Sequence, residues 1–137
     1  MVGVGTRLRR TVSGFTLIEL MIVMTLIIIL AGIGVMTYTN GVTRAKEAVL
    51  KEDLFRMRDA LDQFYADKNE YPASLQLLVD EGYLRDLPVD PITNSAATWV
   101  TELAQPGLDN PLAGPGIFNV RSGAETTAID GTAYSEW

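Results

Sequence analysis

The feature that most constrains this chain is a long apolar run near its N-terminus. Residues 15–36 read FTLIELMIVMTLIIILAGIGVM and carry one charged side chain, Glu19. As a helix rising about 1.5 Å per residue, the run spans roughly 30 Å, which is the thickness of the hydrocarbon core of a bilayer. Arg7, Arg9 and Arg10 precede it, and by the positive-inside rule they place the N-terminus in the cytoplasm. The sequence therefore predicts a single membrane anchor followed by an outward-facing domain.

Composition narrows the classes of protein to consider. The chain has 137 residues, 11 Lys and Arg against 17 Asp and Glu, and neither His nor Cys. The length allows one small domain beyond the anchor. A net charge of −6 argues against a nucleic-acid partner, which requires a basic surface. Because the commonest general base, thiol nucleophiles and thiolate zinc ligands are all absent, we expect no enzyme.

Three other interpretations of residues 15–36 compete with a specialised anchor. A cleaved signal peptide has an apolar region of roughly 7–15 residues, which is shorter than this one. A buried core helix would need more apolar chain around it than the polar-rich remainder supplies. A generic anchor does not explain Glu19, because a carboxylate inside a bilayer costs on the order of 2.5–3.5 kcal/mol. Glu19 is thus a candidate functional residue that needs a partner.

The residues around Glu19 carry a family resemblance. Residues 14–19, GFTLIE, follow an Arg-rich leader and closely resemble the prepilin cleavage motif of type IV pilins and type II secretion pseudopilins. The resemblance implies that a prepilin peptidase cleaves between Gly14 and Phe15 and that Phe15 is then N-methylated. It also implies that Glu19 meets the amino terminus of a neighbouring subunit. A buried carboxylate beside a buried ammonium costs less than either charge alone, so this contact would supply the partner.

The helix is predicted to continue beyond the apolar run to about Ala66. Apolar residues recur there at steps of four and three, which is the spacing of one buried face of an amphipathic helix: Leu50, Leu54, Met57, Leu61 and Phe64. Two pairs of opposite charge at i,i+4 spacing are expected to lie on the solvated face: Glu47 with Lys51 and Glu52 with Arg56.

The remaining residues predict a small headpiece. Pro72 ends the long helix, and Ser74 caps a second helix from Leu75 to Glu81 that Gly82 closes. Residues 71–94 resemble the middle of major pseudopilins. Short strand-forming runs follow at 99–101 and 117–120, and we expect the aromatic pair Tyr134 and Trp137 to pack against the resulting sheet.

These features together predict an α+β, type IV pilin-like fold. Its long N-terminal helix, transmembrane in its first half, packs on a small C-terminal antiparallel β-sheet headpiece. The predicted boundaries are a leader peptide at 1–14, the transmembrane or filament-core half of the helix at 15–36, its extracytoplasmic amphipathic half at 37–68, and the headpiece at 69–137.

The resemblance also implies a calcium ion, because major pseudopilins use calcium to fix the C-terminal loop. Ser122, Glu125 and Asp130 are the candidate ligands in this chain, with main-chain carbonyls completing the six to eight oxygens that calcium prefers. The acidic, glycine-rich character of the family's loop is weak here, since residues 126–129 read TTAI. Calcium is therefore a prediction that needs a direct test.

The function that the resemblance implies is that of a structural subunit of a secretion pseudopilus, which drives folded proteins across the outer membrane. The alternative is a subunit of a surface type IV pilus that serves adhesion, motility or DNA uptake. The implied partners are further copies in a homopolymer, minor pseudopilins, the peptidase, and an inner-membrane platform with its cytoplasmic ATPase. The expected location is the inner membrane, with the headpiece in the periplasm. From a different class, a membrane-anchored binding domain or enzyme would need pocket chemistry that the sequence does not display.

Overall fold

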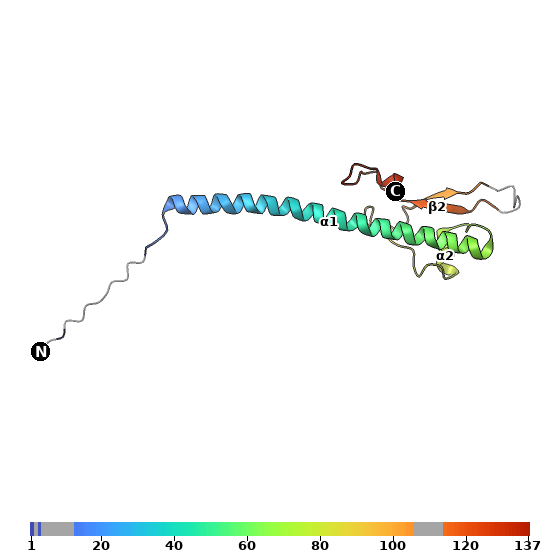
Figure 1. Ribbon diagram of the computed structural model, residues 1–137, viewed down its shortest axis with the longest axis horizontal. Helices are drawn as coiled ribbons and strands as arrows, with labels where there is room; N and C mark the ends of the chain where they lie inside the picture. Colours follow the sequence, from blue (N-terminus) through green and yellow to red (C-terminus); the bar gives the residue numbers. More distant parts are fainter. Residues whose placement is uncertain (2, 4–12, 106–113) are drawn as a thin grey trace. The chain divides into compact units, whose positions relative to one another are not determined.

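The computed structural model describes residues 1, 3, 13–105 and 114–137. Arg7, Arg9 and Arg10, with most of the predicted leader at 1–14, lie outside the described residues. The elements follow in the order α1 (Leu17–Lys68), α2 (Leu75–Asp80), β1 (Val100–Leu103), β2 (Ile117–Arg121) and the 3₁₀ helix η1 (Tyr134–Glu136), as Figure 1 shows. The chain divides into two compact units, Met1–Tyr38 and Thr39–Trp137.

The first unit contains the start of α1. Every described side chain from Leu17 to Tyr38 is exposed, although the sequence here is strongly apolar. The helix contains a stretch that is long and apolar enough to cross a membrane, with a mean hydropathy of 2.6. The hydroxyl groups of Thr25 and Thr37 donate hydrogen bonds to main-chain carbonyl oxygens one turn earlier, at 2.8 and 3.1 Å. This unit therefore confirms the predicted N-terminal apolar helix.

The second unit contains the rest of α1, which has one buried face. The five residues of the predicted apolar stripe are all buried, together with Ala60. The helix ends at Lys68, two residues beyond the predicted Ala66. Asn69 follows with a positive φ of 55° and donates its N–H to the carbonyl of Tyr65 at 2.8 Å. Asparagine tolerates this left-handed conformation, so it ends the helix as glycine often does.

The short helix α2 forms where the sequence predicts it. The Oγ of Ser74 accepts a hydrogen bond from the N–H of Leu77 at 3.3 Å, which satisfies one of the free donors at the helix start. Glu81 is the C-terminal cap, and Gly82 follows with a φ of 83°. The helix thus ends one residue earlier than predicted, and its Leu75 and Leu78 are buried.

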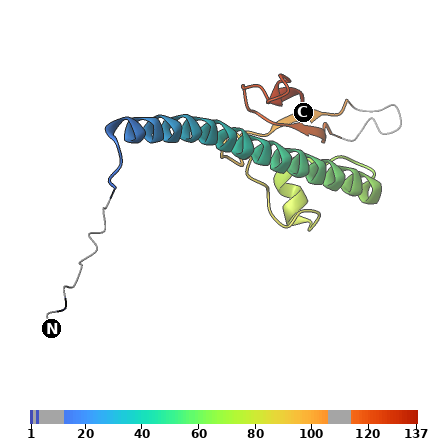
Figure 2. The same ribbon diagram turned by 60° about the vertical axis from the view of Figure 1, so that its left-hand side comes forward.

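The sheet has two antiparallel strands, β1 and β2, with Val100 opposite Arg121 and an irregularity between Glu102 and Leu103. The strands and α2 pack along the second part of α1 from different sides (Figures 1 and 2). One core joins these elements, and its buried members are Leu50, Leu54, Met57, Ala60, Leu61, Phe64, Leu75, Leu78, Trp99, Ile117, Val120, Ala124, Ala128 and Tyr134. The predicted α+β fold, with a long helix packed on a small antiparallel sheet, is confirmed.

Candidate processing and assembly site

The predicted cleavage point lies just outside the first helix. Residues 13–16 are exposed and precede α1, which begins at Leu17. The peptide bond between Gly14 and Phe15 is therefore free of helical hydrogen bonds and accessible from the surface. Gly14 has no neighbouring atom within 4 Å of the position where a Cβ would stand. Nothing in the described part of the chain therefore requires glycine at this position.

Thr16 caps the start of α1, a role that the sequence interpretation missed. Its Oγ1 accepts a hydrogen bond from the N–H of Glu19 at 3.2 Å, and its carbonyl accepts one from the N–H of Leu20 at 3.1 Å. Threonine followed three residues later by glutamate is the sequence signature of a capping box. The signal was present in TLIE, and it fixes the helix start two residues after Phe15.

Glu19 lies in the first turn of α1, where the partial positive charge of the helix N-terminus favours a carboxylate. Its side chain is exposed and makes no hydrogen bond or ion pair within the described residues. The hydroxyls of Thr25 and Thr37 on the same apolar part of the helix are satisfied by main-chain carbonyls. No described residue therefore occupies the carboxylate of Glu19.

Of the three predicted calcium ligands, Ser122 has other partners. It is fully buried, and its Oγ donates a hydrogen bond to Oδ2 of Asp90 at 2.5 Å and accepts one from the N–H of Ala124 at 3.2 Å. The carboxylate of Asp90 is also fully buried and accepts main-chain hydrogen bonds from Ile92 and Thr93. Ser122 therefore joins the end of β2 to the loop that contains Asp90.

The other two predicted ligands are exposed. Oδ1 of Asp130 accepts hydrogen bonds from the hydroxyl of Thr132 at 2.6 Å and from its N–H at 3.0 Å. These two bonds lower the pKa of the Asp130 carboxyl below its ordinary value. No three acidic side chains among the described residues are grouped to hold a metal. Ser122, Glu125 and Asp130 therefore fit a calcium site poorly, and calcium binding stays a prediction.

The two predicted charge pairs on α1 have different outcomes. Glu52 and Arg56 form an ion pair with 2.9 Å between Oε1 and Nε, which confirms this predicted pair. Glu47 instead accepts hydrogen bonds from Ile129 and Tyr134 in the C-terminal segment. No ion pair between Glu47 and Lys51 occurs in the described part of the chain. Lys51 is exposed as expected, whereas Glu47 is half-buried against a distant segment.

Comparisons with known proteins agree with this geometry. Residues 9–35 match the family model described as the prokaryotic N-terminal methylation motif. The chain is 37% identical over 102 residues to the type II secretion system core protein G of Pseudomonas aeruginosa, covering 63% of this chain and 72% of that protein. It is 32% identical to the same protein of Aeromonas hydrophila, covering 63% and 71%.

A shorter match reaches a protein with a different name. The fimbrial protein EcpC of Eikenella corrodens is 38% identical over 66 residues, which are 48% of this chain and 43% of that protein. No solved structure matches the chain significantly.

Proposed function

Because the chain belongs to the family of the type II secretion system core protein G, we propose that it is the repeating structural subunit of a secretion pseudopilus. It is a structural protein and not an enzyme. The observation that carries the proposal is the identity of 37% over 72% of a core protein G, which extends beyond the N-terminal motif into the headpiece. Further copies of the chain assemble with it into the pseudopilus.

The apolar part of α1 gives this assembly a physical basis. Its side chains from Leu17 to Tyr38 are exposed on all sides of the helix. In a single subunit, lipid covers this surface, and in a filament the same surface packs against the helices of neighbouring subunits. The subunit waits in the inner membrane with its N-terminus in the cytoplasm and its headpiece in the periplasm.

Processing prepares the N-terminus for assembly. A prepilin peptidase cleaves between Gly14 and Phe15, and the new amino group at Phe15 is N-methylated. This amino group carries a positive charge at a helix N-terminus, where the helix dipole disfavours it. The carboxylate of Glu19 from a neighbouring subunit neutralises this positive charge. The same contact offsets the cost of burying the carboxylate. An inner-membrane platform with a cytoplasmic ATPase polymerises the subunits, and the growing filament drives folded proteins through the outer membrane. Minor pseudopilins are further partners.

A deletion strain distinguishes the pseudopilus from a surface pilus. We expect loss of the gene to leave the normally secreted proteins inside the cell, and expression of the intact chain to restore their release. Counting surface fibres by electron microscopy in the same strains provides the second measurement. Loss of surface fibres with unchanged secretion would replace the proposal by the surface pilus, a role that the match to the fimbrial protein supports.

A further inference from the structure

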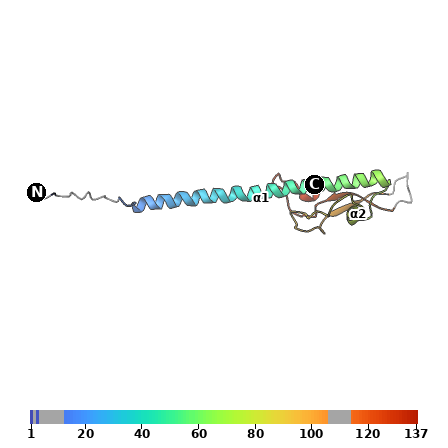
Figure 3. The ribbon, with the colours of Figure 1, turned by 90° about the horizontal axis from the view of Figure 1, so that it is seen from below.

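The C-terminal segment, residues 122–137, contacts three charged side chains on α1. Glu47, Lys51 and Arg58 each interact with a different part of this segment. All three residues and the segment belong to the unit Thr39–Trp137. Figure 3 shows the C-terminal end beside α1. We infer that the helix itself fastens the C-terminal segment and that the headpiece therefore folds fully without a metal ion.

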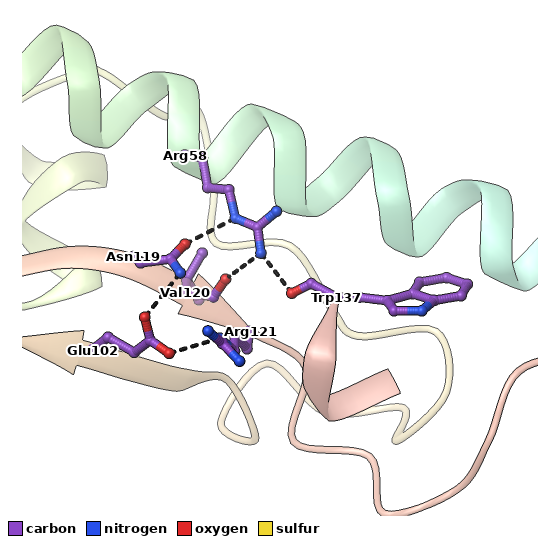
Figure 4. Close-up of polar contacts among 6 residues, drawn as sticks. All are labelled: Arg58, Glu102, Asn119, Val120, Arg121 and Trp137. Carbon is purple, nitrogen blue, oxygen red and sulfur yellow. Dashed lines mark hydrogen bonds and ion pairs between the residues drawn. The ribbon is translucent and has the colours of Figure 1, made fainter. Parts of the chain in front are cut away.

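Arg58 provides the first fastening point. Its half-buried guanidinium group donates from Nε to Oδ1 of Asn119 at 2.9 Å, and from Nη2 to the main-chain oxygens of Val120 at 3.0 Å and Trp137 at 2.6 Å (Figure 4). One side chain thus connects α1, β2 and the C-terminal segment. The planar fork of arginine holds several acceptors in a fixed geometry, whereas the ammonium group of lysine is a compact charge with rotatable donors.

The Arg58 contacts extend into the sheet. The amide nitrogen of Asn119 donates to Oε2 of Glu102 at 2.9 Å, and Oε1 of Glu102 pairs with Nε of Arg121 at 2.6 Å (Figure 4). Asn119 is therefore held from both sides, with its oxygen toward Arg58 and its nitrogen toward β1. The position of the Arg58 guanidinium group is fixed by both strands.

Glu47 and Lys51 provide the other fastening points. Oε1 of Glu47 accepts hydrogen bonds from the N–H of Ile129 at 2.8 Å and from the hydroxyl of Tyr134 at 2.9 Å. The ammonium group of Lys51 lies 4.2 Å from the centre of the Trp137 ring, within the range of a cation–π contact. The Trp137 ring packs edge-on against Tyr134, with 5.1 Å between centroids. The predicted packing of these aromatic residues therefore involves α1 as well as the sheet.

The segment also closes on itself. The N–H of Tyr134 donates to the carbonyl of Thr126 at 3.2 Å, and the N–H of Ala128 donates to the carbonyl of Thr132 at 2.7 Å. Gly131 completes the turn with a φ of 87°, a conformation that glycine adopts without strain. Thr132 also binds Asp130 and accepts from the indole N–H of Trp137 at 2.8 Å. Oδ1 of Asp130 and the carbonyl oxygens of Thr126 and Thr132 thus already have partners within the protein.

The buried pair Asp90 and Ser122 fixes the start of the segment independently. Next to it, Gly123 passes so close to Thr98 that a Cβ would overlap its carbonyl oxygen. The segment is thus held at its start by the loop before β1 and at its end by α1. Protein groups alone satisfy both attachments, in disagreement with the calcium ion that the family resemblance implies.

The test uses the full chain in detergent micelles and measures the unfolding temperature and the hydrogen exchange of amides in residues 122–137. The wild-type protein is compared in calcium chloride and in a calcium chelator. We expect the unfolding temperature and the exchange rates to be the same in both. A lower unfolding temperature with faster exchange in the chelator, restored by added calcium, would overturn the inference.

Variants test the three helix residues directly. We expect Glu47→Gln and Arg58→Met to raise the exchange rates of amides in 126–137 by at least about tenfold. The matched controls Asp62→Asn and Arg85→Met remove the same kinds of charge from exposed positions and should leave these rates unchanged.

If Glu47→Gln or Arg58→Met prevents folding, two milder variants still test the inference. Lys51→Met changes an exposed side chain and should alter the fluorescence of Trp137 and speed exchange near it. Arg58→Lys should give an intermediate exchange rate because it keeps the charge and loses the fork. Rates equal to those of the controls in all four helix variants would contradict the inference.

Discussion

The two parts of α1 differ in what their apolar side chains contact. From Leu17 to Tyr38 the side chains are exposed on every side of the helix, whereas beyond Thr39 one stripe is buried by the headpiece and most of the other side chains are polar. The first part is the more apolar of the two, and the second part contains no isoleucine. Apolar content alone therefore does not decide whether a helix is buried within its own chain.

The distribution of the apolar residues explains this difference. An apolar surface on all sides can be covered only by lipid or by other helices, so the first part is suited to contacts between molecules. A stripe with a period near 3.6 residues can be covered by one small sheet and one short helix of the same chain. Changes in the first part should affect assembly, and changes in the second part should affect folding. The following predictions test this separation.

The largest effect is expected for Glu19→Ala. Removing one member of a buried ion pair costs about 3–5 kcal/mol, so subunits should insert into the membrane but fail to polymerise. Pelleting of sheared filaments measures assembly, and thermal unfolding in detergent measures the headpiece. An unchanged yield of filaments would show that Glu19 has no partner in the filament. A lowered unfolding temperature would show that the two parts are not separable.

Leu61→Ala should have the opposite profile. Leu61 is fully buried, and replacing a buried leucine by alanine typically costs about 2–5 kcal/mol. Denaturant unfolding of the full chain in detergent should show this loss. The control Leu26→Ala truncates an exposed leucine in the first part and should leave the free energy of unfolding of the headpiece unchanged. Equal losses in the two variants would remove the distinction between the parts of α1.

Thr16→Ala should have a smaller and more local effect. Loss of a helix cap costs about 0.5–2 kcal/mol, so the amides of Glu19 and Leu20, which are bonded to Thr16, should exchange faster. The control Thr25→Ala removes a hydroxyl from the middle of the helix and should not change them. If exchange at these two amides were the same in both variants, the capping role of Thr16 would be wrong.

The smallest effect is expected from the titration of Tyr134 in the headpiece. Burial and the hydrogen bond to Glu47 raise the pKa of Tyr134 from 10.0 to about 12. The folded chain therefore keeps this proton after the unfolded chain has lost it, and the free energy of unfolding should fall as the pH rises from 10 to about 12.

Tyr134→Phe should make this fall smaller, and tyrosinate absorbance in the folded protein should lose its last-titrating component. A matched control is Asp67→Asn. A hydrogen bond to Asp67 raises the pKa of Tyr83, so this variant affects a different tyrosine and should leave the titration of Tyr134 unchanged. An unchanged pH profile in Tyr134→Phe would show that Tyr134 does not hold its proton in the folded state.

Local patterns predicted most of the secondary structure. The stripe from Leu50 to Phe64 has a helical period, and Ser74 before an apolar run signals a helix start, so both were predictable. Thr16 was predictable as well, since its capping partner lies three residues away.

Contacts between distant residues were not predictable in the same way. Arg58 and Trp137 are 79 positions apart, and no local pattern indicates that a guanidinium group on a helix binds the end of the chain. Glu47 has an oppositely charged residue at i+4, which suggested a surface pair. Its actual partners, Ile129 and Tyr134, depend on how the C-terminal segment folds. Ser122 was predicted as a calcium ligand from the family resemblance, and its buried partner Asp90 was not foreseen because it lies 32 positions earlier.

Intact mass spectrometry of subunits from purified filaments tests the central claim most directly. The account predicts a polypeptide that begins at Phe15 with one methyl group on its amino nitrogen. A filament built from subunits that still begin at Met1 would contradict it, because Glu19 would then have no new ammonium group to meet.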